Sequence, residues 1–246
     1  MSLHIVDRGE GGPAFLLLHG FGGSSELWTD VVVGLPPGRR CVVPDLRGFG
    51  ASGGAVTCIE EHLDDVDELA RQRGLKDFVI AGHSMGGKLA AAYAARRPVG
   101  LRAVALIAAS PLGPEPMEDR TRTKLLDQHG DQEAMEALVD QITATPLEAT
   151  RRASFVTSNL KTSAQAWRWW LEGGSREDLI VRAKDVSAPV FILAGSLDRV
   201  LGVGVQNEAA RSLGARRLSL APNAGHLLPL EDPAACIRML AAAAAA

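Results

Sequence analysis

A Gly-x-Ser-x-Gly pentapeptide at residues 82–86 constrains this chain more than any other feature. It follows an apolar run at residues 78–81, which predicts a buried strand, and precedes a small-residue stretch at 88–95, which predicts a helix. Such a context lets a sharp turn hold Ser84 in a strained backbone conformation, with its hydroxyl clear of the sheet. The two glycines of the pentapeptide carry no Cβ to block that approach. We therefore expect Ser84 to act as a nucleophile.

A serine hydroxyl needs a base to take its proton, and two suitable residues follow in the chain. Asp198 comes just after the apolar run 189–195, and His226 follows the run 217–220 and a short loop. Each therefore lies at the carboxyl end of a predicted strand, where ligands and chemistry collect in an open α/β sheet. We expect Ser84, His226 and Asp198 to form a triad of nucleophile, base and acid.

A glycine-rich loop after the apolar run 14–18 supplies the fourth part of the predicted site. The loop reads His-Gly-Phe-Gly-Gly at residues 19–23, and its glycines allow backbone N–H groups to point inward. We expect the amides of Phe21 and Met85 to donate to the oxygen that becomes negative in a tetrahedral intermediate. Loss of one such donor typically slows a reaction on the order of 100- to 1000-fold.

These motifs together resemble the α/β-hydrolase superfamily, in its esterase, lactonase and C–C hydrolase branch. Besides the pentapeptide, the resemblance rests on the histidine–glycine loop with Trp28, and on residues 44–52 (PDLRGFGAS), 195–198 (GSLD) and 223–226 (NAGH). It implies a mostly parallel, twisted sheet of about eight strands with helices on both faces. It also implies a helical cap inserted into that core.

Composition favours one globular core with an insertion. The chain has 246 residues, 46% hydrophobic and 22% charged, and its net charge is −3. Acidic and basic residues are interspersed, so no basic patch indicates nucleic acid. No apolar run is long enough to span a bilayer, and the N-terminal residues do not resemble a signal peptide. Three widely spaced cysteines favour a reducing, cytoplasmic setting and form no metal-binding spacing. We expect no metal or cofactor. We also expect a monomer or homodimer.

Alternating strand and helix patterns fill the two ends of the chain but not its middle. Strand-like runs recur up to residue 108 and again from residue 189, which predicts a parallel sheet. The stretch between them is rich in polar helical sequence, and the family resemblance implies that it covers the active site. We therefore expect a hydrolase core at residues 1–111 and 188–246 and a helical cap at residues 112–187.

Four further residues are candidates for substrate binding. His83 adjoins the nucleophile and is expected to shape the pocket without acting as a base. Trp167 and Trp170 would lie on one side of a cap helix, with Trp169 on the other, and would either anchor the cap or line an apolar acyl pocket. Lys88 lies one helical turn beyond the nucleophile and is either a solvated helix residue or an anion-binding one.

The motifs predict a serine hydrolase that cleaves a small carboxylic ester or lactone through an acyl-enzyme on Ser84. The same triad would serve a C–C bond hydrolase, an enol-lactonase, or the menaquinone-pathway synthase that eliminates pyruvate, in which Lys88 would stand where that branch carries Arg. A haloalkane dehalogenase is disfavoured because its nucleophile would be Asp. A hypothesis of another class is a non-catalytic small-molecule sensor on the same fold. The expected partner is a small ester or lactone, and neither nucleic acid nor a membrane.

Overall fold

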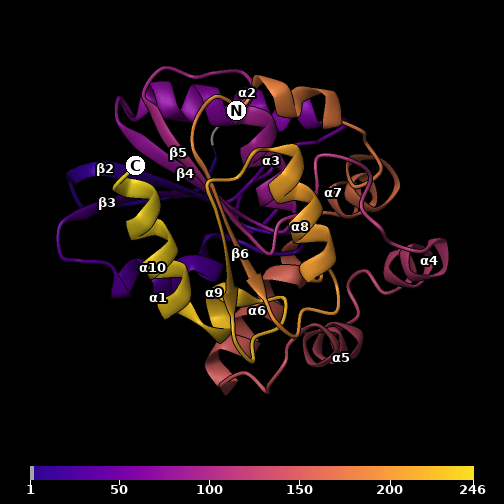
Figure 1. Cartoon of the computed structure of the whole chain (residues 1–246). Coiled ribbons are helices and arrows are strands. Elements are labelled where there is room, and N and C mark those ends of the chain that lie inside the picture. The colour runs from indigo at the N-terminus through magenta and orange to yellow at the C-terminus, as the bar shows by residue number, and fades with distance from the viewer. Residues whose placement is uncertain (1–2) are drawn as a thin grey trace.

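The computed structural model describes residues 3–246, which fold around one twisted sheet (Figure 1). Within these residues seven strands pair in the order β1-β3-β2-β4-β5-β6-β7, and only β1 runs antiparallel to its neighbour. Their bounds are β1 Ile5–Arg8, β2 Gly11–Leu18, β3 Arg39–Pro44, β4 Phe78–His83, β5 Leu101–Ile107, β6 Val190–Gly195 and β7 Arg217–Ala221. The family resemblance implied about eight strands, and the apolar runs of the sequence account for the seven observed here.

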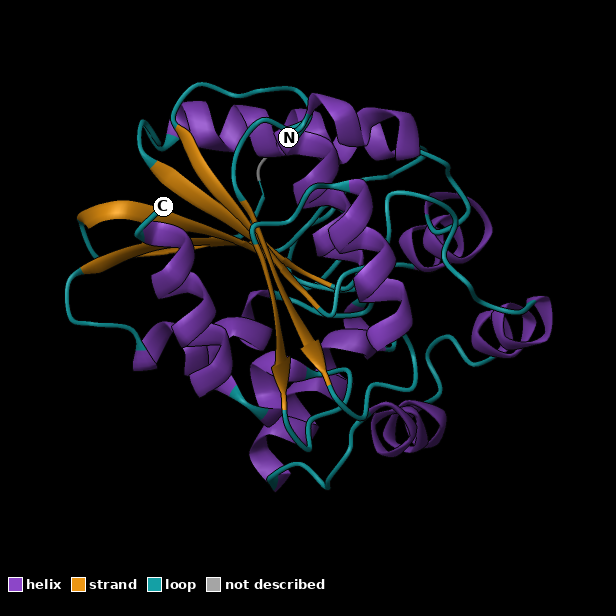
Figure 2. Ribbon diagram, in the orientation of Figure 1, coloured by secondary structure: helices purple, strands orange, loops and turns teal. Residues whose placement is uncertain are grey.

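Helices cover both faces of the sheet, which confirms the predicted fold class (Figure 2). One face is covered by α10, which packs against β4, β5 and β6 and also contacts α1; α2, α3 and α8 cover the other. The core helices are α1 Thr29–Gly34, α2 Ile59–Gln72, α3 Met85–Ala94, α8 Val203–Ser212, α9 Leu228–Glu231 and α10 Pro233–Ala244, with a 3-10 turn η1 at Ser25–Trp28. Because both faces are covered, β4 and β6 are buried along their whole length, and His83 at the end of β4 is their one polar side chain.

The residues between β5 and β6 form a largely helical segment, which we call the cap segment (residues 112–187). It contains α4 Asp119–Asp127, α5 Gln132–Ile142, α6 Ala149–Lys161 and α7 Ala164–Trp169, then a π-helical turn η2 at Trp170–Gly174 and a 3-10 turn η3 at Ile180–Asp185. Helices α4, α5 and α7 lie to one side of the sheet in Figure 1. The role of this segment as a separate cap domain stays a prediction.

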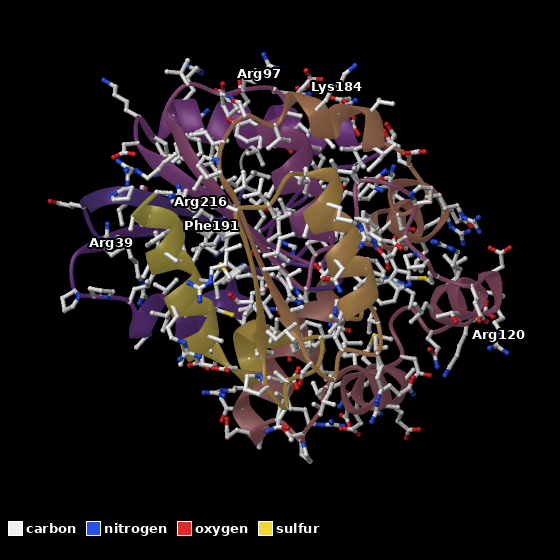
Figure 3. All side chains as sticks on the ribbon, viewed as in Figure 1. Arg39, Arg97, Arg120, Lys184, Phe191 and Arg216 are labelled. Carbon is white, nitrogen blue, oxygen red and sulfur yellow. The ribbon has the colours of Figure 1, made fainter. Side chains whose placement is uncertain are left out.

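Charged side chains lie mainly at the surface of this fold. Figure 3 shows Arg97, Arg120 and Lys184 projecting from the rim of the molecule. Within the described residues, no helix is both long and apolar enough to cross a membrane. Lys88 and Arg122 depart from this surface pattern because both are buried, and their contacts bear on the candidate site.

The crossing of β4 and α3 depends on the absence of a side chain at Gly82. A Cβ there would overlap the carbonyl oxygen of Gly86, which belongs to the backbone and cannot move aside cheaply. We predict that Gly82→Ala lowers the free energy of unfolding by about 2–3 kcal/mol or more, measured by urea denaturation. The control is Gly204→Ala in α8, where nothing lies within 4 Å of an added Cβ. An equal loss of stability in both variants would contradict the proposed overlap.

Candidate active site

Ser84 occupies the turn between β4 and α3 with a positive φ. Its φ of 51° and ψ of −120° are unusual for a residue with a side chain. The Ser84 amide donates to the carbonyl oxygen of Ile107 at 3.1 Å, and the Ser84 carbonyl accepts from the amide of Ser110 at 3.0 Å. These two bonds tie the turn to the end of β5, so the neighbouring strand stabilises the strained backbone.

The side chains of Ser84, His226 and Asp198, which follow three different strands, are linked by two consecutive hydrogen bonds. Ser84 Oγ lies 3.0 Å from His226 Nε2, and His226 Nδ1 lies 2.9 Å from Asp198 Oδ2. With a proton on Nδ1, the neutral imidazole donates to Asp198 and accepts from the Ser84 hydroxyl. The arrangement can therefore move a proton from Ser84 to His226 while Asp198 holds the ring in one orientation.

The Asp198 carboxylate is stabilised in its charged form. Its Oδ1 accepts hydrogen bonds from the amides of Val200 at 2.7 Å and Leu201 at 2.9 Å. Burial opposes ionisation, but the attraction of His226 and these donors outweigh it, and the pKa of Asp198 falls below its usual range. Asp198 is therefore an anion beside His226 at neutral pH.

His83 holds the backbone of the loop that carries His226. Its Nε2 lies 2.8 Å from the carbonyl oxygen of His226 and donates to it, while Nδ1 is enclosed without a partner among the described residues. Burial, together with the repulsion of His226, lowers the pKa of His83 to about 3, so this ring is neutral. His83 also lines the cavity beside Ser84, the position expected from its place next to the nucleophile in the sequence.

The glycine-rich loop after β2 lies directly against the Ser84 turn. A Cβ at Gly20 would lie 2.6 Å from His83 Nδ1 and 3.1 Å from Ser84 Cβ. His19 braces this loop, because its Nε2 accepts from the amide of Leu46 at 2.9 Å and its Nδ1 donates to its neighbour's carbonyl at 2.8 Å.

The two amides expected to form an oxyanion hole are free to donate. Among the described residues, neither the amide of Phe21 nor that of Met85 donates a hydrogen bond to another group. Met85 follows Ser84 directly in the chain. The assignment of these amides to an oxyanion hole stays a prediction.

A cavity of about 80 Å³ adjoins Ser84 and His226. Its wall is largely apolar, and Glu115 and Asn159 are polar members of it that come from the cap segment. It adjoins a wider groove of about 430 Å³ along α4 and α5. The residues that line both hollows are Glu115, Met117, Leu125, Leu138, Ile142 and Val200. Within residues 3–246, no cluster of His, Cys, Asp or Glu side chains is arranged to hold a metal ion.

The three tryptophans of the cap segment are all buried, but they have different neighbours. Trp170 lines the cavity beside Ser84, as one of the two sequence interpretations expected. Trp167 does not line it; its ring packs against Phe21 with 4.3 Å between centroids, and its Nε1 donates to the Leu125 carbonyl at 2.8 Å. Trp169 packs against His62 at 4.8 Å between centroids.

Lys88 is neither a solvated residue nor part of the cavity wall. It is fully buried on α3, and its Nζ donates to the carbonyl oxygens of Gly113 at 3.0 Å and Glu177 at 2.5 Å. Both acceptors belong to the cap segment, which covers a helix position that would otherwise face solvent. Lys88 therefore binds the cap segment to the core.

Sequence reasoning did not single out Glu115 or Asn159. Glu115 lies in a Gly-Pro-Glu-Pro stretch at residues 113–116, and Asn159 lies in α6. A carboxylate between two prolines, or a polar residue on an amphipathic helix, carries no signal that it faces a cavity. Only the path of the cap segment over the sheet brings them to Ser84.

Comparisons with known proteins agree with this architecture. A sequence model described as the alpha/beta hydrolase fold matches residues 13–158, which is more than half of the chain. The chain is 28% identical to a pimeloyl-[acyl-carrier protein] methyl ester esterase of Nitrosomonas europaea, over 94% of this chain and 95% of that protein.

Two solved structures share the fold over almost the whole length. An esterase from Exiguobacterium antarcticum aligns with a TM-score of 0.91 at 18% identity, covering 99% of this chain and 96% of the other. An enol-lactonase from Burkholderia xenovorans aligns with a TM-score of 0.86 at 21% identity, with the same coverage of 99% and 96%. At these identities the likeness concerns the fold.

Lys88 makes stability depend on pH in a direction that can be measured. Burial lowers its pKa to about 8, from an ordinary value of about 10.4. Between these values the unfolded chain binds a proton that the folded chain has lost, so folding becomes more favourable as pH rises. We predict that the unfolding free energy of wild type minus that of Lys88→Met grows by up to about 1.4 kcal/mol per pH unit above about pH 8.

Urea denaturation at several values between pH 7 and pH 10 measures this difference. Lys184→Met, which removes an exposed lysine, serves as the control for the loss of a surface amine. A difference between wild type and Lys88→Met that stays constant or shrinks with pH would show that Lys88 is charged throughout.

The orientation of His226 predicts the effect of Asp198→Asn. The amide would donate to Nδ1 and so move the imidazole proton to Nε2, which could then no longer accept from Ser84. We predict that the labelling rate of Ser84 by a fluorophosphonate falls on the order of 10,000-fold. The matched control, Asp185→Asn, removes a surface carboxylate that pairs with Arg97 and should leave the rate unchanged.

Proposed function

Because this chain belongs to the alpha/beta hydrolase family, we propose that it is a serine hydrolase that cleaves a small carboxylic ester or lactone through an acyl-enzyme on Ser84. The observation that carries this proposal is the pair of hydrogen bonds from Ser84 through His226 to Asp198, at 3.0 and 2.9 Å. The similarity to an esterase over nearly the whole chain supports the same reaction class.

The proposed reaction proceeds in two halves. Ser84 Oγ attacks the substrate carbonyl while His226 Nε2 takes its proton, and Asp198 stabilises the resulting imidazolium. The amides of Phe21 and Met85 bind the oxygen that becomes negative. His226 then protonates the leaving alcohol, and a water molecule, activated by the same ring, releases the acid and restores Ser84.

The environment of Lys88 bears on the synthase alternative. That alternative needs a cation at Lys88 to bind an anionic intermediate, whereas Lys88 Nζ already donates to two backbone carbonyls and lies outside the cavity wall. Among the contacts of residues 3–246, none favours a C–C hydrolase over an esterase or lactonase. A non-catalytic sensor would have the same arrangement of Ser84, His226 and Asp198. Rapid multiple turnover of a substrate would identify the protein as an enzyme.

The cellular setting and assembly are part of the proposal. All three cysteines are free, and two of them, Cys41 and Cys236, are buried, which supports a reducing, cytoplasmic environment. We propose a monomer or homodimer that acts on a small molecule.

The proposal predicts that Ser84→Ala loses ester turnover while it retains the fold. Hydrolysis of p-nitrophenyl esters from acetate to decanoate by wild type should fall on the order of a million-fold in the variant, to background. Because the cavity beside Ser84 is small, about 80 Å³, we expect short acyl chains to be preferred. Circular dichroism and thermal unfolding check that the variant is folded.

Retained activity in folded Ser84→Ala would overturn the assignment of the nucleophile. Absence of turnover by wild type on every p-nitrophenyl ester and on simple lactones, despite labelling of Ser84 by a fluorophosphonate, would overturn the proposed reaction and favour the sensor.

A further inference from the structure

A buried carboxyl group outside the triad faces the cavity beside Ser84. Glu115 is a buried residue, 7% exposed, and it lines both this cavity and the wider groove along α4 and α5. It therefore lies at the junction of the two hollows. A substrate that extends from Ser84 into the groove would pass this carboxyl group.

One oxygen of Glu115 is held, and the other is available. Oε2 accepts a hydrogen bond from Ser110 Oγ at 2.9 Å, and the amide of Ser110 in turn donates to the Ser84 carbonyl. Oε1 accepts no hydrogen bond from the described residues, and it is not completely enclosed by protein atoms. The carboxyl is thus held relative to the nucleophile, and its second oxygen has no partner among the described residues in a residue that lines both hollows.

The backbone around Glu115 is held by buried polar groups. The Glu115 amide donates to the Ser175 carbonyl at 2.7 Å, and the Glu115 carbonyl accepts from Arg122 Nη2 at 3.3 Å. Arg122 also donates to the carbonyl of Leu171 at 2.7 Å, while Lys88 holds the carbonyl of Gly113. Burial of such charges is costly unless they are well bonded, and here their bonds go to the segment that carries Glu115.

These cations hold the backbone and do not neutralise the side chain. Within residues 3–246, the hydrogen bonds of Lys88 and Arg122 go to backbone carbonyls and to the Ser175 hydroxyl, and none goes to the Glu115 carboxylate. Burial raises the pKa of Glu115, against the opposing effects of Ser110, His226 and the two cations. The carboxyl therefore retains hydrogen-bonding capacity in either protonation state, as an acceptor when ionised and as a donor when protonated.

We propose that Glu115 is a specificity-determining residue whose Oε1 binds a hydroxyl group of the substrate. The proposal rests on the function proposed above, and it names the substrate class as esters or lactones that carry a hydroxyl near the scissile bond. A hydroxyl both donates and accepts, so it pairs with either form of the carboxyl. A purely apolar substrate would enclose Oε1 without a partner, which costs binding. A substrate carboxylate at the same place would be repelled by the like charge of Glu115 whenever this group is ionised.

The test compares isosteric substrates that differ in one hydroxyl group. Ethyl 3-hydroxybutyrate is paired with ethyl 3-methylbutyrate for a hydroxyl on the acyl side, and 2-hydroxyethyl butyrate with propyl butyrate for one on the alcohol side. Acid release in a pH-stat gives kcat/KM for each. We expect wild type to favour the hydroxylated member of at least one pair by about 10-fold or more.

Two variants then assign this preference to Glu115. Glu115→Leu should remove it by lowering kcat/KM for the hydroxylated substrate about 10-fold, with little loss on its isostere. Glu115→Gln keeps the side-chain volume and one oxygen that can accept a hydrogen bond, so it should retain part of the preference. The control, Glu172→Gln, removes a surface carboxylate that pairs with Arg168 and should change neither value.

The outcomes are distinct from failure of the hydrolase function itself. Wild type that hydrolyses both members of each pair equally would overturn the proposal, and this measurement does not depend on how any variant folds. Equal losses in Glu115→Leu on both members would also overturn it and indicate a role in holding the site together. Failure of the hydrolase function would instead appear as no turnover of any ester.

Discussion

The close approach of β4 and α3 at the Ser84 turn is the constraint on which the rest of the site depends. A Cβ at Gly86 would lie 2.5 Å from the His19 carbonyl oxygen and 2.6 Å from that of Leu18, so the helix begins in contact with the end of β2. Because β2 and β5 flank β4 in the sheet, the glycine-rich loop lies on one side of Ser84 and Ser110 on the other. The strand order thus determines the neighbours of the nucleophile.

How far the sequence could predict this site follows from the same geometry. The parallel strands end at one edge, so a motif placed after each strand also has a predictable place in space, and the structure brings Ser84, Asp198 and His226 together there. The fold class and the family are confirmed. The burial of Lys88 could not be predicted from the sequence. A lysine on a helix is expected to face solvent unless a segment distant in the chain covers it. Glu115 had no periodic pattern to mark it, since it lies in an irregular stretch.

The cap segment is attached to the core by two different kinds of interaction. On one side, Lys88 binds the carbonyls of Gly113 and Glu177, a polar attachment that needs specific geometry. On the other side, the Trp167 ring packs against the Phe21 ring, which is an apolar contact. Because Gly113 lies two residues before Glu115, the attachment at Lys88 is close to the carboxyl group that we propose to recognise the substrate.

The role proposed for Phe21 would couple the cap segment to the reaction. Its amide is one of the two proposed oxyanion donors, while its side chain packs on Trp167 and lines the cavity. An oxyanion donor acts through a hydrogen bond whose strength depends on position within a few tenths of an ångström. A change in the cap segment that moves Trp167 would therefore alter the rate through the Phe21 backbone, even where no residue that touches the substrate is replaced.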